Sequence, residues 1–389
     1  MSPILRLSVL RVVGTMVLVL LLSGCALKSR QFSAPDEAHY TKALVTGYKN
    51  IRYWGDQRAA YAYTTMDRLK LNKKLHQRVD ILALSGGAED GAYGAGFLKG
   101  WSERGDRPEF TMVTGISTGA LIAPFAFLGP EYDHVLKRLF TESSKKNIFV
   151  LTPFRALFGG SAVADTAPLR RILKEEIDDD FVAALAREGR KGRILQIGTT
   201  NLDAQRPVIW EISEIAQSGY PGAKHLIQQI MLASASIPGV FPPVLIDVRI
   251  EGKKHQELHV DGGVTQQIFV YPYDLNVRWY EKALGIRPQK HFWLIRNTKI
   301  NPEYHIVDLG VSDIAGRSVS TLIKYQGRDN LKNIMSLAKR DGFKVHITHV
   351  PASFDTPLEE MFDKRYMGAL YRVGYEKGRT RSGWQRGFE

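Results

Sequence analysis

The 389-residue sequence offers little besides a hydrophobic core to stabilise its fold. It contains one cysteine, Cys25, so no disulfide can form within the chain. It has no internal repeat, no low-complexity segment and no metal-ligand spacing among its ten histidines. Its N-terminal apolar run is shorter than the about 20 residues that a membrane-spanning helix needs. We therefore expect no metal or other cofactor, and a fold held together by its core.

The first 24 residues are typical of a cleaved secretory signal. Arg6 and Arg11 precede or border an almost unbroken apolar run at 12–22. The run ends in Leu22-Ser23-Gly24-Cys25, which resembles the lipobox of bacterial lipoproteins. The resemblance implies that residues 1–24 are removed and that Cys25 becomes lipidated. The alternative is an ordinary signal peptide with a stray cysteine.

A lipidated N-terminus would make the protein membrane-anchored. Several acyl chains hold a protein to a bilayer more firmly than one does. Ala26 stands where an aspartate would resemble an inner-membrane retention signal, so we expect an outer-membrane location in the cell envelope. The net charge of +13 either favours anionic lipid headgroups or reflects a generally basic surface. Nucleic-acid binding is excluded by export and by the lack of a basic stripe, and the sequence does not indicate an oligomeric state.

Strand and helix patterns alternate through the body of the chain. Apolar runs bounded by glycine predict strands, and longer segments between them predict helices. This order predicts a three-layer α/β/α fold with a mostly parallel central sheet. We expect an N-terminal extension at 25–78, a main α/β domain at 79–280 and completing strands and helices at 281–389. The predicted strands are 79–84, 110–114, 193–199, 207–212, 258–261, 291–296 and 343–349; the predicted helices are 91–103, 120–128, 131–142, 168–177, 225–233, 306–340 and 355–378.

The segment Gly115-Ile116-Ser117-Thr118-Gly119 lies between a predicted strand and a predicted helix. A nucleophilic serine in a strained strand-to-helix turn needs small residues two positions to either side. The N-terminus of the next helix also favours negative charge developing at the serine. We interpret Ser117 as a nucleophile, with a plain glycine-rich turn as the alternative.

Two further glycine motifs follow predicted strands. Ser85-Gly86-Gly87-Ala88 presents backbone amides that can converge on an oxyanion, although it can also be a tight structural turn. Asp261-Gly262-Gly263 leaves a carboxylate open, and partial desolvation would make Asp261 basic enough to accept a proton. Alone, the Asp-Gly-Gly sequence is more often a structural turn.

Together these motifs resemble the patatin-like phospholipase family. A fourth segment, 233–244, is similar to the family's run of small residues before a proline-rich turn, and the match spans about 79–276. The resemblance implies a two-residue dyad without histidine, in which Ser117 is the nucleophile and Asp261 the base. It also implies an oxyanion hole lined by the amides of Gly86, Gly87 and Ala88, with Gly115 and Gly119 flanking the nucleophile.

The sequence departs from the family pattern at two positions. Ala88 replaces a usual glycine, which keeps the amide but is harmless only if its φ is negative. Asp90 stands where many members carry a cation, which puts in doubt the binding of a substrate anion at that position.

The resemblance implies a serine acyl hydrolase that acts on membrane lipids. Three alternatives remain: a Ser-His-Asp esterase that uses His291 or His346, a lipid acyltransferase, and a catalytically silent envelope lipoprotein. We interpret His346 and His349 as structural, because their spacing in a strand places them on opposite faces. Aromatic residues at 149–158 predict either a lipid-facing lid or core packing.

Overall fold

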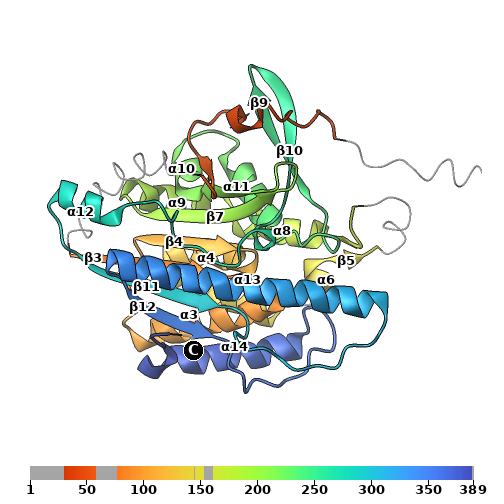
Figure 1. Cartoon of the computed structure of the whole chain (residues 1–389), viewed down its shortest axis with the longest axis vertical. Helices are drawn as coiled ribbons and strands as arrows, with labels where there is room; N and C mark the ends of the chain where they lie inside the picture. Colours follow the sequence, from red (N-terminus) through yellow and green to blue (C-terminus); the bar gives the residue numbers. More distant parts are fainter. Residues whose placement is uncertain (1–29, 58–76, 144, 153–160, 388–389) are drawn as a thin grey trace, which may run out of the picture.

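The computed structural model describes residues 30–57, 77–143, 145–152 and 161–387. Its centre is a ten-stranded sheet in which five neighbouring strands are parallel (Figure 1). Except for the strand at the edge, these strands are buried over most of their length, as is usual for parallel strands with helices on both faces. In sheet order they are β7 (Ile194–Asn201), β4 (Met112–Ile116), β3 (Arg78–Leu84), β11 (Gln289–Arg296) and β12 (Lys344–His349).

Antiparallel strands extend the sheet beyond β7. The hairpin of β9 (Val244–Ile250) and β10 (Lys253–Asp261) pairs with β7 through β10, and β8 (Arg206–Glu211) also pairs with β7. Two short strands of the N-terminal extension complete it. β1 (Leu44–Val45) pairs with β9 and β2 (Arg52–Trp54) with β8, so the described part of the extension is integrated into the sheet.

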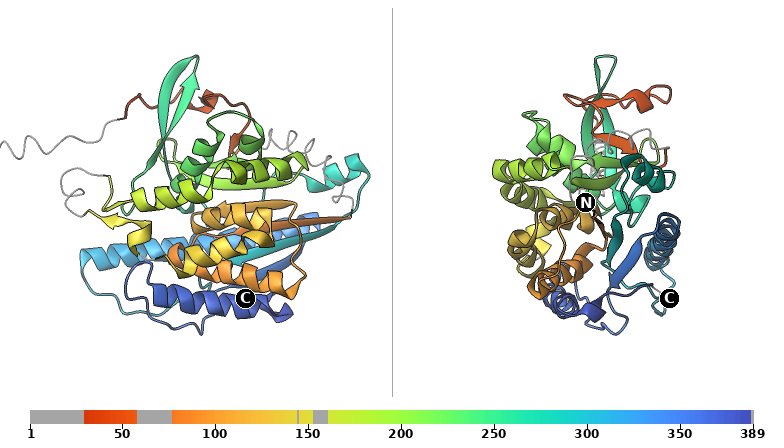
Figure 2. Two further views of the ribbon diagram at one scale, coloured as in Figure 1. Left: turned by 180° about the vertical axis from the view of Figure 1, so that it is seen from behind. Right: turned by 90° about the vertical axis from the view of Figure 1, so that its left-hand side faces the viewer.

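Helices cover both faces of the sheet, which confirms the predicted three-layer arrangement (Figure 2). Alternate residues of β3 separate the two interfaces. Leu82 and Leu84 pack in the larger core, whereas Ile81 and Ala83 pack in the core under α13. The larger layer contains α3 (Gly91–Arg104), α4 (Thr118–Leu128), α5 (Asp133–Thr141), α8 (Ala167–Glu176), α9 (Asp179–Arg190), α10 (Ile212–Gln217), α11 (Ala223–Ser234) and α14 (Lys364–Gly378); the other face carries α12 (Val277–Leu284) and α13 (Val311–Asp341).

Most predicted elements are present, with boundaries shifted by a few residues. Between the predicted helices at 131–142 and 168–177, where no helix or strand was predicted, the structure has α6 (Lys145–Ile148) and β5 (Val150–Leu151), and β5 pairs with β6 (Ala164–Asp165). The predicted strand at 258–261 is the end of the longer strand β10. No strand was predicted for β9, β1 or β2.

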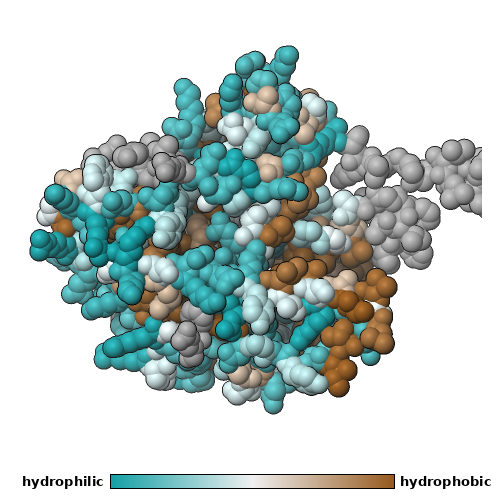
Figure 3. All heavy atoms as spheres, viewed as in Figure 1, coloured by the Kyte–Doolittle hydropathy of each residue, from teal (hydrophilic) through white to brown (hydrophobic). Residues whose placement is uncertain are grey.

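The first half of α13 and the loop before it form an exposed apolar surface, named here the α13 apolar surface. It comprises Tyr304, Ile306, Leu309, Val311, Ile314, Val319, Leu322, Ile323, Tyr325 and the nearby Leu358, all at least 40% exposed. Figure 3 shows apolar side chains gathered over this end of the helix. An apolar patch of this extent marks an interaction surface more often than chance exposure.

Candidate active site

Ser117 occupies a sharp turn between β4 and α4. Its backbone has φ 53° and ψ −124°, a conformation that costs a non-glycine residue about 1–3 kcal/mol. The flanking glycines are required because backbone passes close to both. A Cβ on Gly115 would lie 2.4 Å from the carbonyl oxygen of Gly119, and a Cβ on Gly119 would lie 2.3 Å from the carbonyl oxygen of Leu84. The turn holds Ser117 directly before the N-terminus of α4, where partial positive charge favours a developing anion.

Asp261 is the last residue of β10, opposite Thr199 of β7, and it is 5% exposed. Burial raises the pKa of Asp261 to about 7, while hydrogen bonds from the Ser117 hydroxyl and the Gly263 amide oppose this rise. The Gly263 amide nitrogen lies 2.6 Å from Asp261 Oδ1. The structure thus brings the predicted nucleophile and base into contact, and a carboxylate with this pKa is suited to accepting a proton near neutral pH.

The run of small residues at the end of α11 holds both of these residues in place. The Ser117 amide donates to Ser234 Oγ at 2.9 Å, and Ser234 Oγ donates to the Gly198 carbonyl oxygen at 2.7 Å. The Asp261 amide donates to the Ser236 carbonyl oxygen at 2.9 Å. The segment matched by resemblance at 233–244 therefore fixes the backbones of Ser117 and Asp261.

The glycine-rich loop after β3 lies against Ser117. A Cβ on Gly86 would be 3.1 Å from Ser117 Cβ. The amide of Gly86, expected to face an oxyanion, instead donates to the Gln267 carbonyl oxygen at 3.2 Å. The amides of Gly87 and Ala88 have no acceptor in the described part of the chain. Two of the three expected donors are therefore available to a ligand.

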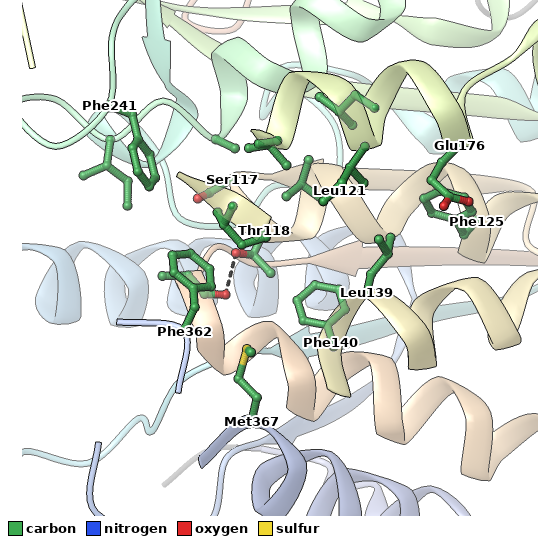
Figure 4. A pocket seen from close by; sticks show the side chains of 17 residues that line it. Ser117, Thr118, Leu121, Phe125, Leu139, Phe140, Glu176, Phe241, Phe362 and Met367 are labelled. Carbon is green, nitrogen blue, oxygen red and sulfur yellow. Dashed lines mark hydrogen bonds between the residues drawn. The ribbon is translucent and has the colours of Figure 1, made fainter. Parts of the chain in front are cut away.

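Alanine in place of the usual glycine would be harmless only if its φ were negative, but the φ of Ala88 is +47°. A left-handed backbone at alanine costs about 1–2 kcal/mol relative to glycine. The carbonyl oxygen of Ala88 accepts a hydrogen bond from the Thr118 hydroxyl at 2.7 Å, drawn as the dashed line in Figure 4. This bond joins the loop to the start of α4 and holds Ala88 in its strained conformation.

Of the two acids after Ala88, Glu89 is buried and Asp90 is partly buried. Burial raises the pKa of Glu89, and it raises the pKa of Asp90 to about 7. The Tyr366 hydroxyl donates to Asp90 Oδ1 at 2.5 Å. At neutral pH Asp90 therefore carries less than a full negative charge.

An apolar pocket opens beside Ser117 (Figure 4). Apart from Ser117, Thr118 and Glu176, every side chain along it is apolar. Ser117 and Phe241 lie on one side in Figure 4, and Phe125 and Glu176 on the other. The remaining lining residues are Ala88, Leu121, Leu139, Phe140, Ile148, Leu169, Ile172, Leu173, Ala235, Ile237, Phe362 and Met367.

The aromatic segment at 149–158 is described only in part. Phe149 is 1% exposed, and its ring centroid lies 5.4 Å from that of Phe241 and 5.9 Å from that of Phe362. Phe149 therefore packs in the core beside the pocket. Residues 153–160 and Cys25 lie outside the described residues.

The histidines nominated for a triad lie at the other end of the sheet. His291 pairs with Asp80 at the start of β3, four residues before Leu84, whereas Leu84 pairs with Gly115. At about 3.3 Å per residue this separates His291 from the Ser117 turn by about 13 Å along the strands. His291 and His346 hydrogen-bond to each other at 2.9 Å. Across the described ranges, no group of side chains is arranged to hold a metal ion.

Two residues that support the site lie outside the motifs found in the sequence. The carbonyl oxygen of Gln267 accepts the hydrogen bond of the Gly86 amide. Asn297, which follows β11, donates its side-chain amide to the Ser85 carbonyl oxygen at 2.8 Å and thereby supports the start of the loop. Their roles depend on contacts between segments far apart in the sequence.

Three comparisons relate this chain to known proteins. The patatin-like phospholipase family model matches residues 82–272. A search among curated proteins finds no match. Among solved structures, the chain is similar to VipD from Legionella pneumophila, with 13% identity over 78% of this chain and a TM-score of 0.33. That alignment spans 66% of the VipD chain and is too loose to inform fold or function here.

The family match covers the three motif segments and the segment that holds them in place. Residues 82–272 include the glycine-rich loop, the Ser117 turn, the supporting segment at the end of α11 and Asp261. The fold around them is a mixed α/β structure with a parallel sheet at its centre. Residues 82–272 of the chain form a patatin-like phospholipase domain.

Proposed function

We propose that this protein hydrolyses acyl esters of membrane lipids through a covalent intermediate on Ser117, with Asp261 as the base. The patatin-like phospholipase domain already indicates a lipid acyl hydrolase; the dyad and the substrate are our additions. The observation that carries the proposal is the strained Ser117 turn, whose hydroxyl hydrogen-bonds to a buried carboxyl group beside an apolar pocket.

The first half of the reaction acylates the serine. Asp261 takes the proton from the Ser117 hydroxyl while Oγ bonds to the ester carbonyl carbon. The carbonyl oxygen becomes an oxyanion, which the amides of Gly87 and Ala88 would stabilise by about 3 kcal/mol per donor. Breaking the bond to the leaving alcohol, which takes the proton from Asp261, leaves the acyl group on Ser117.

The second half returns the enzyme to its starting state. A water molecule gives a proton to Asp261 as its oxygen attacks the acyl carbon. The bond to Ser117 Oγ then breaks, Oγ regains the proton, and a fatty acid leaves. Each step uses groups of this chain and water alone.

The apolar pocket is the proposed site of the acyl chain. Each methylene group that leaves water for such a surface contributes about 0.8 kcal/mol. Glu176 lies across the pocket from Ser117 in Figure 4, where it is held by an ion pair with Arg138 at 2.5 Å. An acyl chain long enough to reach Glu176 would have to desolvate this carboxylate, so we propose that Glu176 limits the length of the chain.

We also propose that the protein acts at a membrane, anchored through lipidated Cys25 in the outer membrane. The α13 apolar surface supports this view, because it would suit a lipid interface. Of the helices in the described ranges, none is long and apolar enough to cross a bilayer.

Hydrolysis assays with matched variants test the dyad. The full-length chain would be given p-nitrophenyl octanoate and a phospholipid, with a chelator present, beside Ser117→Ala and Asp261→Asn. Ser336→Ala and Asp329→Asn, on the exposed side of α13, are the controls for each chemical change. We expect the parent and both controls to cleave the esters, and both site variants to lose at least about 10³-fold in rate.

Other outcomes would redirect the proposal. Cleavage of the p-nitrophenyl ester without cleavage of the phospholipid would keep the chemistry and change the substrate. No cleavage of either ester by folded protein would refute hydrolysis, and an assay with an added acceptor alcohol would then separate an acyltransferase from a silent lipoprotein.

A further inference from the structure

A second pocket lies on the far side of the turn that follows the glycine-rich loop. The turn spans Ala88–Asp90; its first residue lines the acyl pocket and its last lines this second pocket. The end of β11, the middle of α13 and the segment before α14 supply the other walls. The residues that matter for its chemistry are Asp90, Arg296, Thr298, Ile323 and Leu358.

Arg296 is a buried cation that forms no ion pair within the described residues, although the nearby Asp90 favours its charge and partly offsets the lowering of its pKa by burial. Its side chain is 2% exposed, and its Nη1 atom has no hydrogen-bond partner in the described part of the chain. Thr298 Oγ1, two residues further on, is also buried and unpaired among those residues. A buried charge is costly unless another group compensates it. The pocket therefore presents a charge and a hydroxyl that an anion would satisfy.

The surrounding helix is shaped to hold the guanidinium. Gly327 lies in the interior of α13, and a Cβ at this position would lie 2.4 Å from Arg296 Nη2 and 2.6 Å from Cζ. Glycine is unfavourable inside a helix, and here it provides the space in which Arg296 lies. Arg296 is thus built into the fold.

The other charged groups of the pocket largely neutralise one another. Lys299 and Lys324 both pair with Glu303, at 3.0 and 2.6 Å. Asp90 accepts the Tyr366 hydroxyl, and burial raises its pKa to about 7. Asp355 also lines the pocket. Arg296 is therefore the pocket's cation that lacks an ion-pair partner in the part of the chain that the structure describes.

The pocket opens within the α13 apolar surface. Ile323 and Leu358 line it and are 40% and 46% exposed. An anion bound here would thus have apolar surface beside it, as the phosphate of a phospholipid has its acyl chains. The Ala88–Asp90 turn lies between this pocket and the acyl pocket and lines both of them.

We propose that this pocket binds the phosphate of the phospholipid substrate, with Arg296 as its ion-pair partner. This rests on the proposed function and adds to it a phosphate-bearing substrate. One substrate molecule would place its phosphate beside Arg296, its ester at the amides of Gly87 and Ala88 and one acyl chain in the apolar pocket.

Binding can be measured without turnover. In the full-length Ser117→Ala chain, dihexanoylphosphatidic acid below its micellar concentration should raise the melting temperature, because a ligand of the folded state stabilises it. Inorganic phosphate at the same concentration should raise it much less. Adding Arg296→Met should remove the shift, whereas Lys332→Met, a change at an exposed lysine of the same helix, should keep it. An equal shift with inorganic phosphate, or no shift with either probe, would overturn the proposal.

Kinetics then test the substrate class. We would measure the rate on phosphatidylglycerol divided by that on diacylglycerol with the same acyl chains, in neutral mixed micelles. Arg296→Met should lower this ratio about 10- to 100-fold, as expected for losing a charged hydrogen-bonding partner. Lys332→Met should leave the ratio unchanged.

A second variant covers the case in which Arg296→Met does not fold. Gly327→Ala keeps the charge but forces the guanidinium to move, so it should lower the same ratio. An unchanged ratio in a folded variant would refute the proposal. Complete absence of ester cleavage by the parent chain would instead refute the proposed function, and the melting experiment would remain readable.

Discussion

Replacing Asp261 by asparagine should stabilise the protein while it removes activity. In the folded state the pKa of Asp261 is about 7, against an ordinary value of 3.8. The folded state therefore binds more protons than the unfolded state between these values, and stability falls as pH rises through that range. Each pKa unit corresponds to about 1.4 kcal/mol, so the charged carboxylate destabilises the fold by up to about 4 kcal/mol at pH 8. Asparagine cannot ionise, so the variant lacks this destabilisation at high pH.

Urea unfolding of the parent and Asp261→Asn at pH 5 and pH 8 would measure the effect. The variant should be more stable than the parent by about 1.5 kcal/mol at pH 5 and by about 4 kcal/mol at pH 8, because the difference grows as pH rises from 3.8 to 7. Asp90 also has a raised pKa, but it is present in both proteins and cancels in the comparison. Ser117→Ala is the matched inactive variant: it keeps the charge and should gain no such stability. An Asp261→Asn variant no more stable than the parent at pH 8 would refute the reasoning.

The remaining predictions concern the turn, the loop, the pocket and the base. Gly119→Ala should destabilise the fold by about 2 kcal/mol or more in urea unfolding, because its Cβ would meet backbone at 2.3 Å; stability equal to the parent would contradict this contact. Ala88→Gly should raise stability by up to about 1 kcal/mol, since it relieves a left-handed alanine at some cost in unfolded-chain entropy; a loss of stability would count against the strain. Glu176→Leu should shift the preferred p-nitrophenyl ester to longer acyl chains, and an unchanged preference would remove Glu176 as the limit. The pH profile of kcat/KM should rise through an apparent pKa near 7 as Asp261 becomes charged; a profile flat from pH 5 to 8 would exclude Asp261 as the base.

The central strands could be predicted because their burial shows in the sequence. β3, β4 and β7 are nearly continuous apolar runs that end in glycine or in polar residues. β9 was missed, although Val244, Ile246, Val248 and Ile250 alternate with more exposed residues and the turn Glu251-Gly252 follows. That alternation is a strand signal. β1 and β2 are two and three residues long and pair with strands that are distant in the sequence, so no local pattern could identify them.

The motifs identified the groups of the site but not their surroundings. Ser117 and Asp261 stand out because glycines flank them. Two features of the loop depend on contacts with segments outside it. The Gly86 amide donates a hydrogen bond to the Gln267 carbonyl oxygen, and Ala88 has a positive φ. Arg296 is one arginine among many in the sequence. Its burial results from the packing of α13 against the end of β11, which no local sequence pattern indicates.

Covalent labelling of Ser117 tests the central claim most directly. A fluorophosphonate reacts with an activated serine and forms a stable adduct that mass spectrometry can locate. The account predicts one adduct on the peptide that contains Ser117, none in Ser117→Ala, and much slower labelling in Asp261→Asn. Folded parent protein that is not labelled at Ser117, or is labelled at the same rate when Asp261 is replaced, would contradict a nucleophile activated by this base.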